Sequence, residues 1–409
     1  MKQLLILAYR GLGRNRRRSL LSALALGIGV ALLLFMAAFI EGEMRSSLEL
    51  GIKLDTGHLQ VRRLDYDVAK ASLAWEDLID DPTAIARQVA ALEPVRLATP
   101  RLYAGGILLT GDESLGVRIL GIDPTSEAND VYRNLVGGAW LNPDDREGVL
   151  IGASLAAKRN VAVGDRIALL VNTADGGVDE QRFVVRGVYD THTPTHDQST
   201  ILMPLSKAQA MTGAGERAST VWVMLDDMYA ADAVAAALTS DRYEVQTWAQ
   251  MNPLQLEFER YANAMMIVFY LIVLGITATV AVNAMVMAVF ERTREIGILA
   301  AIGMRERRIM ALFLTESFLL AVGGVGIGLL FGGLGVYYMS VHGIYLGNMA
   351  ADMGLTGFTL GDRLYGYLTA QDAITLIITA FVVTLLASLY PALLAARMEP
   401  VRALHGGEA

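Results

Sequence analysis

Two histidines are the first candidates for chemistry in this chain of 409 residues. His192 and His196 stand four positions apart with Asp190 and Asp197 beside them, and on a helix this spacing would suit zinc. Pro194 lies between the histidines and would disrupt such a helix, so an exposed loop is the simpler interpretation. The pattern leaves open what the two histidines do.

No other group of residues suggests catalysis. The segment GASLA at 152–156 contains a serine but lacks the second glycine of a nucleophile elbow. The sequence has no G-x-x-x-x-G-K-[ST] pattern, so hydrolysis of a nucleotide through a P-loop is excluded. We therefore expect this chain not to be an enzyme and to carry no metal and no cofactor of its own.

One acid and three glycines stand out within a long apolar run. Glu316 lies near one end of that run, where it can reach headgroup water or pair with an arginine, so we favour a structural or coupling role over a proton relay. Gly324, Gly328 and Gly332 recur every four residues and line one helix face, which lets another membrane helix approach closely. The partner is left open between the fourth span, the second span and another subunit.

The elements that must position these residues are membrane helices. Hydrophobic residues make up 54% of the chain and charged residues 19%, which fits a membrane protein with a large water-exposed part. Four apolar runs are long enough to cross a bilayer: 19–40, 261–290, 309–340 and 373–396. The run at 261–290 would be about 45 Å long as a helix, so it tilts or continues beyond the bilayer.

Basic residues determine the expected orientation. Arginines gather before the first span, between the second and third spans and after the fourth, which places these segments in the cytoplasm. The resulting division is an interfacial amphipathic helix at 1–18, the first span at 19–40, an external domain at 41–260, the second span at 261–290, a cytoplasmic segment at 291–308, the third span at 309–340, a short external loop at 341–372, the fourth span at 373–396 and a cytoplasmic tail at 397–409.

The external segment 41–260 is acidic and reads as a mixed α/β domain. It contains 33 acidic and 20 basic residues, which argues against nucleic acid as a partner, and the whole chain lacks cysteine and therefore disulfides. Two subdomains are expected, with 41–95 and 215–260 beside the membrane. Runs rich in β-branched and aromatic residues predict strands at 58–63, 166–171, 182–189, 200–205 and 220–225; helices are predicted at 82–92, 154–160, 206–212 and 228–238, a hairpin turn at Asp175-Gly176-Gly177, and loops at 112–118, 142–148 and 213–217.

The cytoplasmic segment 291–308 has the composition of a docking surface. It is densely charged and lies between two spans, and a solvated helix that satisfies the positive-inside rule is the simpler alternative. Glycines at two positions would permit close approach or a bend. The candidate residues are the charged Glu291, Arg292, Arg294, Glu295, Arg305, Arg307 and Arg308, the apolar Ile296, Ile298 and Leu299, and the glycines Gly297 and Gly303.

The chain resembles the FtsX-like permeases of MacB-type ABC transporters. The resemblance rests on ERTREIGILAAIG from Glu291, on LYPALLAARMEPVRALH near the C-terminus with Pro391 and Pro400, and on RNRRRSLLSALALGIGV at the first span. In the external domain, GVLIGASLAAKRNVAVGDRIALL, FVVRGVYD and TILMPLSKAQAM are similar to the family's periplasmic core domain. The segments TGHLQVRR and VQTWAQMNPL look closest to the lipoprotein-releasing LolC/LolE branch.

This resemblance implies a permease subunit in the bacterial inner membrane. A cytoplasmic ABC ATPase dimer, with its own ATP and magnesium, would dock on 291–308, and a second permease would complete a homodimer or a homologous heterodimer. Mechanotransmission would extract or move a lipoprotein, a lipid-like molecule or another amphiphile, with a periplasmic carrier or membrane-fusion adaptor as a further partner. The alternatives are a division-type regulatory subunit that controls a periplasmic hydrolase and a drug or peptide efflux permease; an ion-coupled carrier ranks last.

Overall fold

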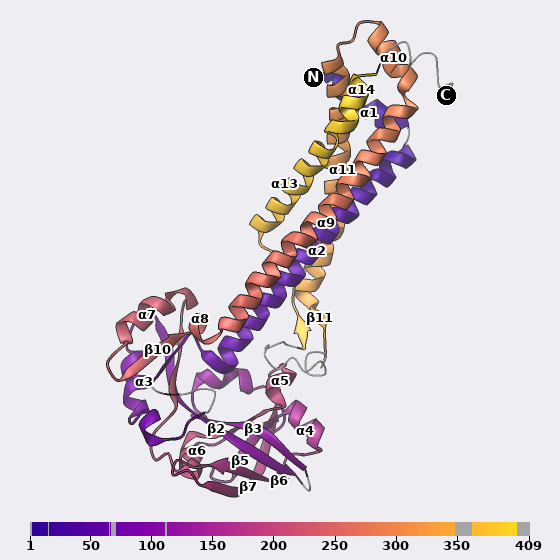
Figure 1. Cartoon of the computed structure of the whole chain (residues 1–409). Helices are drawn as coiled ribbons and strands as arrows, with labels where there is room; N and C mark the ends of the chain where they lie inside the picture. The colour runs from indigo at the N-terminus through magenta and orange to yellow at the C-terminus, as the bar shows by residue number, and fades with distance from the viewer. Residues whose placement is uncertain are drawn as a thin grey trace. The chain divides into compact units, whose positions relative to one another are not determined.

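The chain folds into two compact units. The computed structural model describes residues 2–14, 16–64, 66, 71–110, 113–347 and 362–398 (Figure 1). We call Met1–Met44, Glu259–Ile344 and Leu364–Ala409 the helical unit, and Arg45–Phe258 with Tyr345–Arg363 the strand-rich unit. Most of the expected tail at 397–409 and much of the expected loop at 341–372 fall outside the described residues, Pro400 included.

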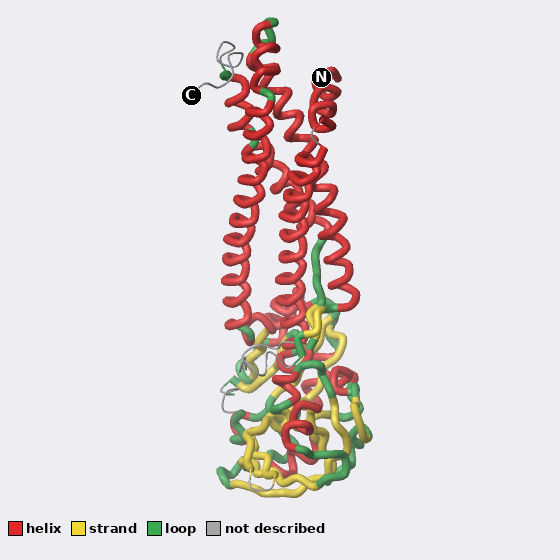
Figure 2. The backbone as a smooth tube through the Cα atoms, turned by 90° about the vertical axis from the view of Figure 1, so that its right-hand side faces the viewer, coloured by secondary structure: helices red, strands yellow, loops and turns green. Residues whose placement is uncertain are grey.

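The helical unit contains four helices long and apolar enough to cross a membrane. Figure 2 shows them as long red helices that run side by side. Each begins before or ends after the run predicted from the sequence, because the helix continues through polar residues that an apolar window omits. The four long helices are α2 (Arg16–Gly51), α9 (Pro253–Glu291), α11 (Glu306–His342) and the pair α13 (Ala370–Ala387) with α14 (Leu389–Ala396). The shorter helices described beside them are α1 (Lys2–Arg14) and α10 (Thr293–Ala301).

Proline positions explain two helix boundaries. Pro253 opens α9 at the first helical position, where its missing N–H has no intrahelical partner to lose. The helix therefore begins eight residues before the predicted span and is about 58 Å long at 1.5 Å per residue. Pro391 lies in the last span and cannot donate to the carbonyl of Ala387, so the helix breaks at Ser388 between α13 and α14.

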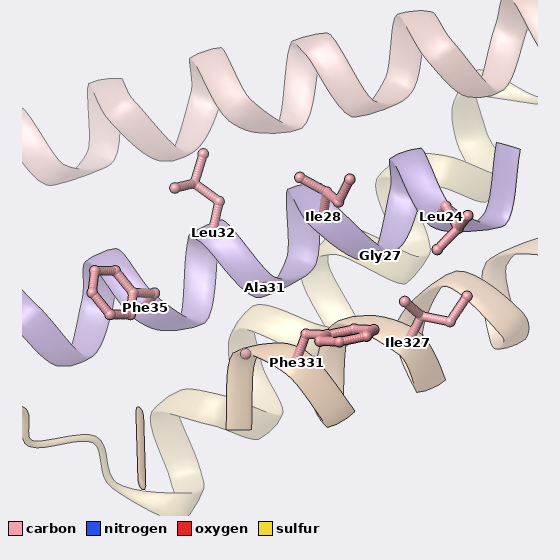
Figure 3. A pocket seen from close by; sticks show the side chains of 9 residues that line it. Leu24, Gly27, Ile28, Ala31, Leu32, Phe35, Ile327 and Phe331 are labelled. Atoms are coloured by element: carbon pink, nitrogen blue, oxygen red, sulfur yellow. The ribbon is translucent and has the colours of Figure 1, made fainter. Parts of the chain in front are cut away.

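The three glycines of α11 pack against α2. Gly324, Gly328 and Gly332 are buried, and a Cβ added to Gly328 would lie 2.6 Å from Val30 Cβ and 2.9 Å from Gly27 O. The partner is therefore the first span, which was not among those left open by the sequence. Beside this contact, an apolar groove of about 480 Å³ runs between α2 and α11 (Figure 3), lined by Leu24, Gly27, Ile28, Ala31, Leu32, Phe35, Ile327, Phe331 and Gly332.

Gly328→Val should destabilise the helical unit by about 1–3 kcal/mol, because the added carbons overlap Val30 and the backbone of Gly27. Gly333→Val is the matched control, since Gly333 is exposed on the same helix and a Cβ there meets no atom within 4 Å. The measurement is thermal unfolding of the purified full chain in detergent. Equal melting temperatures for the two variants would contradict the assigned helix contact.

The strand-rich unit is built on a ten-stranded sheet that closes on itself. Its order is β10-β1-β9-β2-β3-β8-β5-β7-β4, and β6 pairs with both β2 and β7, so β2, β3, β8, β5, β7 and β6 form a closed ring. Closure leaves these strands without exposed edges. The strands are β1 (Leu59–Arg63), β2 (Val95–Thr110), β3 (Glu113–Ile122), β4 (Leu135–Gly138), β5 (Gly148–Gly152), β6 (Arg166–Asn172), β7 (Val178–Tyr189), β8 (Thr200–Pro204), β9 (Thr220–Leu225) and β10 (Tyr243–Thr247), with the separate pair β11 (Ile344–Tyr345) and β12 (Arg363–Leu364).

The long strand β2 joins two hydrophobic cores. Its first half pairs with β9 and its second half with β3 and β6. One core fills the closed ring, and the other lies between β1, β9 and β10 and the helices α3 and α7. The smaller elements are η1 (Ile52–Thr56), η2 (Trp75–Asp77), α3 (Pro82–Ala90), η3 (Glu127–Tyr132), α4 (Ala153–Arg159), α5 (Pro194–Asp197), α6 (Leu205–Thr212), η4 (Met228–Ala230), α7 (Ala231–Leu238) and α8 (Trp248–Met251).

All five predicted strands are present as β1, β6, β7, β8 and β9. The hairpin turn at Asp175-Gly176-Gly177 joins β6 to β7, with Gly176 at φ 80°. The predicted loop at 112–118 is wrong from Glu113 onward, because its polar residues occupy β3, where pairing with β2 and β8 outweighs weak strand propensity. The strands β2, β4, β5 and β10 were not predicted.

Candidate functional site

The charged segment 291–308 is a short helix followed by a tight turn. α9 ends at Glu291, α10 covers Thr293–Ala301, and α11 begins at Glu306. Gly303 adopts φ 94° in the turn between α10 and α11, a conformation that favours glycine. The chain thus reverses within the segment and presents α10 and the turn as one compact feature.

Three of the predicted docking charges are instead paired within the helical unit. Arg292 is buried and donates from Nη1 to Glu316 Oε2 at 3.2 Å, and its Nη2 donates to the carbonyl of Gly11. Glu295 pairs with Arg14 at 2.5 Å, and Glu291 pairs with Arg18. These contacts fasten the segment to α1, α2 and α11.

Glu316 is the buried partner of this junction. It is 1% exposed, and its described ion pair is with Arg292. Of the two surroundings considered from the sequence, headgroup water and an arginine partner, this geometry corresponds to the arginine partner. The sequence did not suggest that Arg292 also donates to the carbonyl of Gly11. This carbonyl is among the last four of α1 and therefore needs a donor from outside the helix.

The apolar residues of the segment divide between core and surface. Ile296, expected from the sequence to be an apolar anchor for a partner, is instead buried against Val289 and Phe313. Gly297 is also buried, and Leu299 is half-buried. Ile298 and Ile302 are 45% and 78% exposed, and Ile302 was not predicted.

Four arginines remain on the surface of the segment. Arg294, Arg305, Arg307 and Arg308 are exposed, and none makes an ion pair with another described residue. Together with Ile298 and Ile302 they form what we call the arginine face. Basic side chains around exposed apolar ones can bind an acidic groove on another protein.

Arg292→Met should destabilise the protein by about 3–5 kcal/mol, because it leaves Glu316 buried without its partner. Arg294→Met, at an exposed position of the same segment, should change stability by less than about 0.5 kcal/mol. Thermal unfolding in detergent is the measurement. The double variant Arg292→Met with Glu316→Leu should recover much of the stability lost in Arg292→Met. If its loss of stability equals the sum of the losses in Arg292→Met alone and Glu316→Leu alone, the pairing is contradicted.

The two histidines separate into different environments. Pro194–Asp197 forms the single turn α5, and His196 is buried while His192 is exposed. The exposed-loop interpretation is therefore wrong for His196, because Pro194 begins a helical turn rather than interrupting one. His192 lies 3.4 Å from Asp362, and Asp197 accepts two hydrogen bonds from Thr191.

His196 belongs to a polar network at the end of the first long helix. Arg118 lies 3.1 Å from His196 Nδ1 and can only donate, so Nδ1 accepts. The neutral ring then donates from Nε2 to the Tyr132 hydroxyl, also at 3.1 Å, which in turn donates to Leu54 O. Arg118 also pairs with Asp55 at 2.6 Å. The network thus joins α5, β3 and η3 to η1.

A second set of donors completes the cap on η1. Arg101 is fully buried, donates to Leu54 O at 3.2 Å and stacks on Trp222 at 4.1 Å. Gln60 donates to the carbonyls of Asp55 and Thr56 at 2.9 Å. The terminal carbonyls of a helix lack intrahelical partners, and these side chains supply them. Sequence reasoning missed Arg101, Arg118 and Tyr132, whose isolated positions carry no motif.

Burial lowers the pKa of His196 to about 3. The folded protein therefore keeps this ring neutral, whereas an unfolded chain takes up a proton below about pH 6.5. The resulting contribution to stability is complete above pH 6.5 and is lost as the pH falls toward 3.

When the pH is lowered from 7 to 5, His196 should reduce the free energy of unfolding by about 2 kcal/mol, because the unfolded chain takes up a proton that the folded chain does not. His196→Gln should therefore lose less stability than the unmodified chain over this range. The measurement is the melting temperature of the full chain in detergent at each pH, with the exposed His192→Gln as control. If the melting temperature of His196→Gln falls between pH 7 and pH 5 as much as that of the unmodified chain, the assignment of His196 as a buried neutral histidine is contradicted.

Two family models match this chain. The MacB-like periplasmic core domain matches residues 19–241, and the FtsX-like permease C-terminal domain matches residues 267–400. The chain belongs to the FtsX-like, MacB-type permease family. This permease is thus an ABC transporter permease of the inner membrane, and the strand-rich unit contains its periplasmic core domain. One relative, from Nitrobacter winogradskyi, is named as the macrolide export ATP-binding/permease protein MacB.

Curated relatives cover nearly the whole permease. The lipoprotein-releasing system transmembrane protein LolE of Haemophilus influenzae is 22% identical over 94% of this chain and 93% of its own length. The macrolide export ATP-binding/permease protein MacB of Rhodospirillum rubrum is 29% identical over 97% of this chain, which spans 59% of that relative's length. The crystal structure of the periplasmic region of MacB from Actinobacillus actinomycetemcomitans is 18% identical, with a TM-score of 0.35, over 50% of this chain and 94% of that one.

Proposed function

We propose that this permease couples ATP hydrolysis by a separate cytoplasmic ATPase to conformational change in its periplasmic domain, and so extracts or moves an amphiphilic substrate. The observation that carries this proposal is the arginine face on a segment whose other side is fastened to α1, α2 and α11. A segment held in this way passes a push on its free face into the membrane helices instead of bending alone.

The route to the periplasmic domain is the continuous helix α9. It begins at Pro253, in the strand-rich unit, and ends at Glu291, directly before α10. No break separates its two ends, and a hydrogen-bonded helix of this kind transmits axial and tilting motion with little loss. α2 is a second such route, since it leads from Arg16 through Gly51 into the capped η1. We expect both termini and the segment 291–308 to be cytoplasmic.

The amphiphilic substrate class is supported by the apolar groove between α2 and α11. Its lining is aliphatic and aromatic, which suits an acyl chain better than a polar solute (Figure 3). The match to LolE supports a lipoprotein or lipid-like substrate. The match to MacB favours a second candidate, export of a drug or peptide with a membrane-fusion adaptor. A dimer of permeases, identical or homologous, is part of either proposal.

The docking proposal predicts that charge reversal on the arginine face releases the ATPase. Arg294→Glu combined with Arg307→Glu should weaken ATPase retention by about tenfold or more, because attraction becomes repulsion. The measurement is affinity purification of the tagged full chain from its native membranes, with mass spectrometry of ATP-binding proteins that co-purify. Arg242→Glu, an exposed reversal in the strand-rich unit, is the control.

Unchanged retention in the double reversal would overturn the docking site. Loss of retention in Arg242→Glu as well would show that charge alone, and not the arginine face, governs binding. Lipoprotein release and drug resistance, measured in the same strains, separate the two substrate classes.

A further inference from the structure

The strand-rich unit contains a cavity of about 350 Å³ that is lined in part by charged and amide side chains. Its lining includes Asp55 and Thr56 from η1, Gln60 and Arg62 from β1, Arg118 from β3 and Gln250 from α8. All of these residues belong to one unit. The cavity therefore lies where the end of the first long helix and the start of the second enter the same domain.

Among the residues that the structure describes, the buried cation Arg62 has no carboxylate partner. It is 5% exposed, and its guanidinium donates to Gln60 Oε1 at 2.7 and 2.9 Å, to Gln246 Oε1 at 2.8 Å and to Met251 Sδ at 3.0 Å. Glu244, opposite Arg62 on β10, accepts from Gln246 instead. Among the described residues no acid lies within ion-pair distance of Arg62, and burial lowers its pKa. A buried charge in this state is costly unless a counter-charge is provided.

Arg118 adds a second guanidinium to the wall. Its Nη2 is directed at Asp55, His196 and Thr200, and within the described chain its Nε and Nη1 have no hydrogen-bond partner. Asp55 balances the charge of Arg118, so the described lining has one unbalanced positive charge, that of Arg62. The cavity thus has the charge and the donors for one monoanion.

We propose that this cavity binds a singly charged oxyanion, a carboxylate or a phosphate group, between Arg62 and Arg118. Planar guanidinium groups match the oxygen pairs of both anions, which explains why arginine is preferred at such sites. A ligand seated here contacts η1 on one side and the residues before Pro253 on the other. Its occupancy ties together the two helix ends and stabilises their present arrangement.

Thermal unfolding of the full chain in detergent tests the site with three probes: sodium acetate, inorganic phosphate and dihexanoyl phosphatidylglycerol, each against sodium chloride at equal ionic strength. We expect a saturable rise in melting temperature with at least one oxyanion. Arg62→Gln should abolish the rise, whereas Arg63→Gln should keep it, because Arg63 is the next residue on β1 and pairs with Asp80 outside the cavity. A response to the phospholipid alone identifies a lipid headgroup as the source, and a response to acetate or phosphate identifies a water-soluble ligand.

Cysteine labelling gives a second readout that does not depend on the stability of Arg62→Gln. The chain has no native cysteine, so Gln250→Cys at the exposed rim of the cavity would carry its only thiol. At ten times its dissociation constant the active probe should slow maleimide labelling about tenfold, since about one site in eleven stays empty. Lys158→Cys, exposed on α4, should label at an unchanged rate.

Absence of a saturable shift with all three probes would overturn the proposal. So would an equal shift in Arg62→Gln, or equal labelling of Gln250→Cys with and without the probe. None of these outcomes bears on ATPase docking, which involves the arginine face alone.

Discussion

The carbonyl groups at helix ends are the constraint on which this structure depends. A helix leaves its last carbonyls without internal partners, and when the end is buried other groups must donate to them. In the strand-rich unit the fully buried Arg101 donates to Leu54 O at the end of η1, assisted by Tyr132 and Gln60. In the helical unit the buried Arg292 donates to Gly11 O, near the end of α1. One guanidinium thus serves each end.

These two arginines have different electrostatic environments. Arg292 has the carboxylate of Glu316 as counter-charge, so its junction is a paired one that can stay closed. Arg101 is compensated by carbonyl oxygens and by the face of Trp222 instead. Nearby, Arg62 has neutral acceptors alone within the described chain. The end of the first helix in the strand-rich unit therefore gathers positive charge, which suits the negative end of the helix dipole and the anion proposed above.

The charged segment combines rigidity with an exposed surface. A simple tether would leave all of its charges in water, but here Glu291, Arg292 and Glu295 are paired internally, whereas Arg294, Arg305, Arg307 and Arg308 are exposed and make no ion pair with a residue that the structure describes. The same charge run therefore holds the segment against α1, α2 and α11 and leaves four arginines exposed. The glycine contact brings the backbones of α2 and α11 close together, and tightly packed contacts of this kind transmit strain.

The sequence by itself determined the four membrane helices, the mixed α/β domain and its clearest strands, because apolar runs, strand-type residues and turn glycines are local signals. It also identified the segment 291–308, whose charge density is visible without a structure. Only the tertiary structure decided which of those charges are free, that Gly328 faces α2, and that His196 is buried. Each of these depends on residues far apart in the chain, such as Gly11 with Arg292 or Leu54 with Arg101 and Tyr132. Local periodicity carries no information about such pairs, and they form because buried polar groups must find partners wherever the fold supplies them.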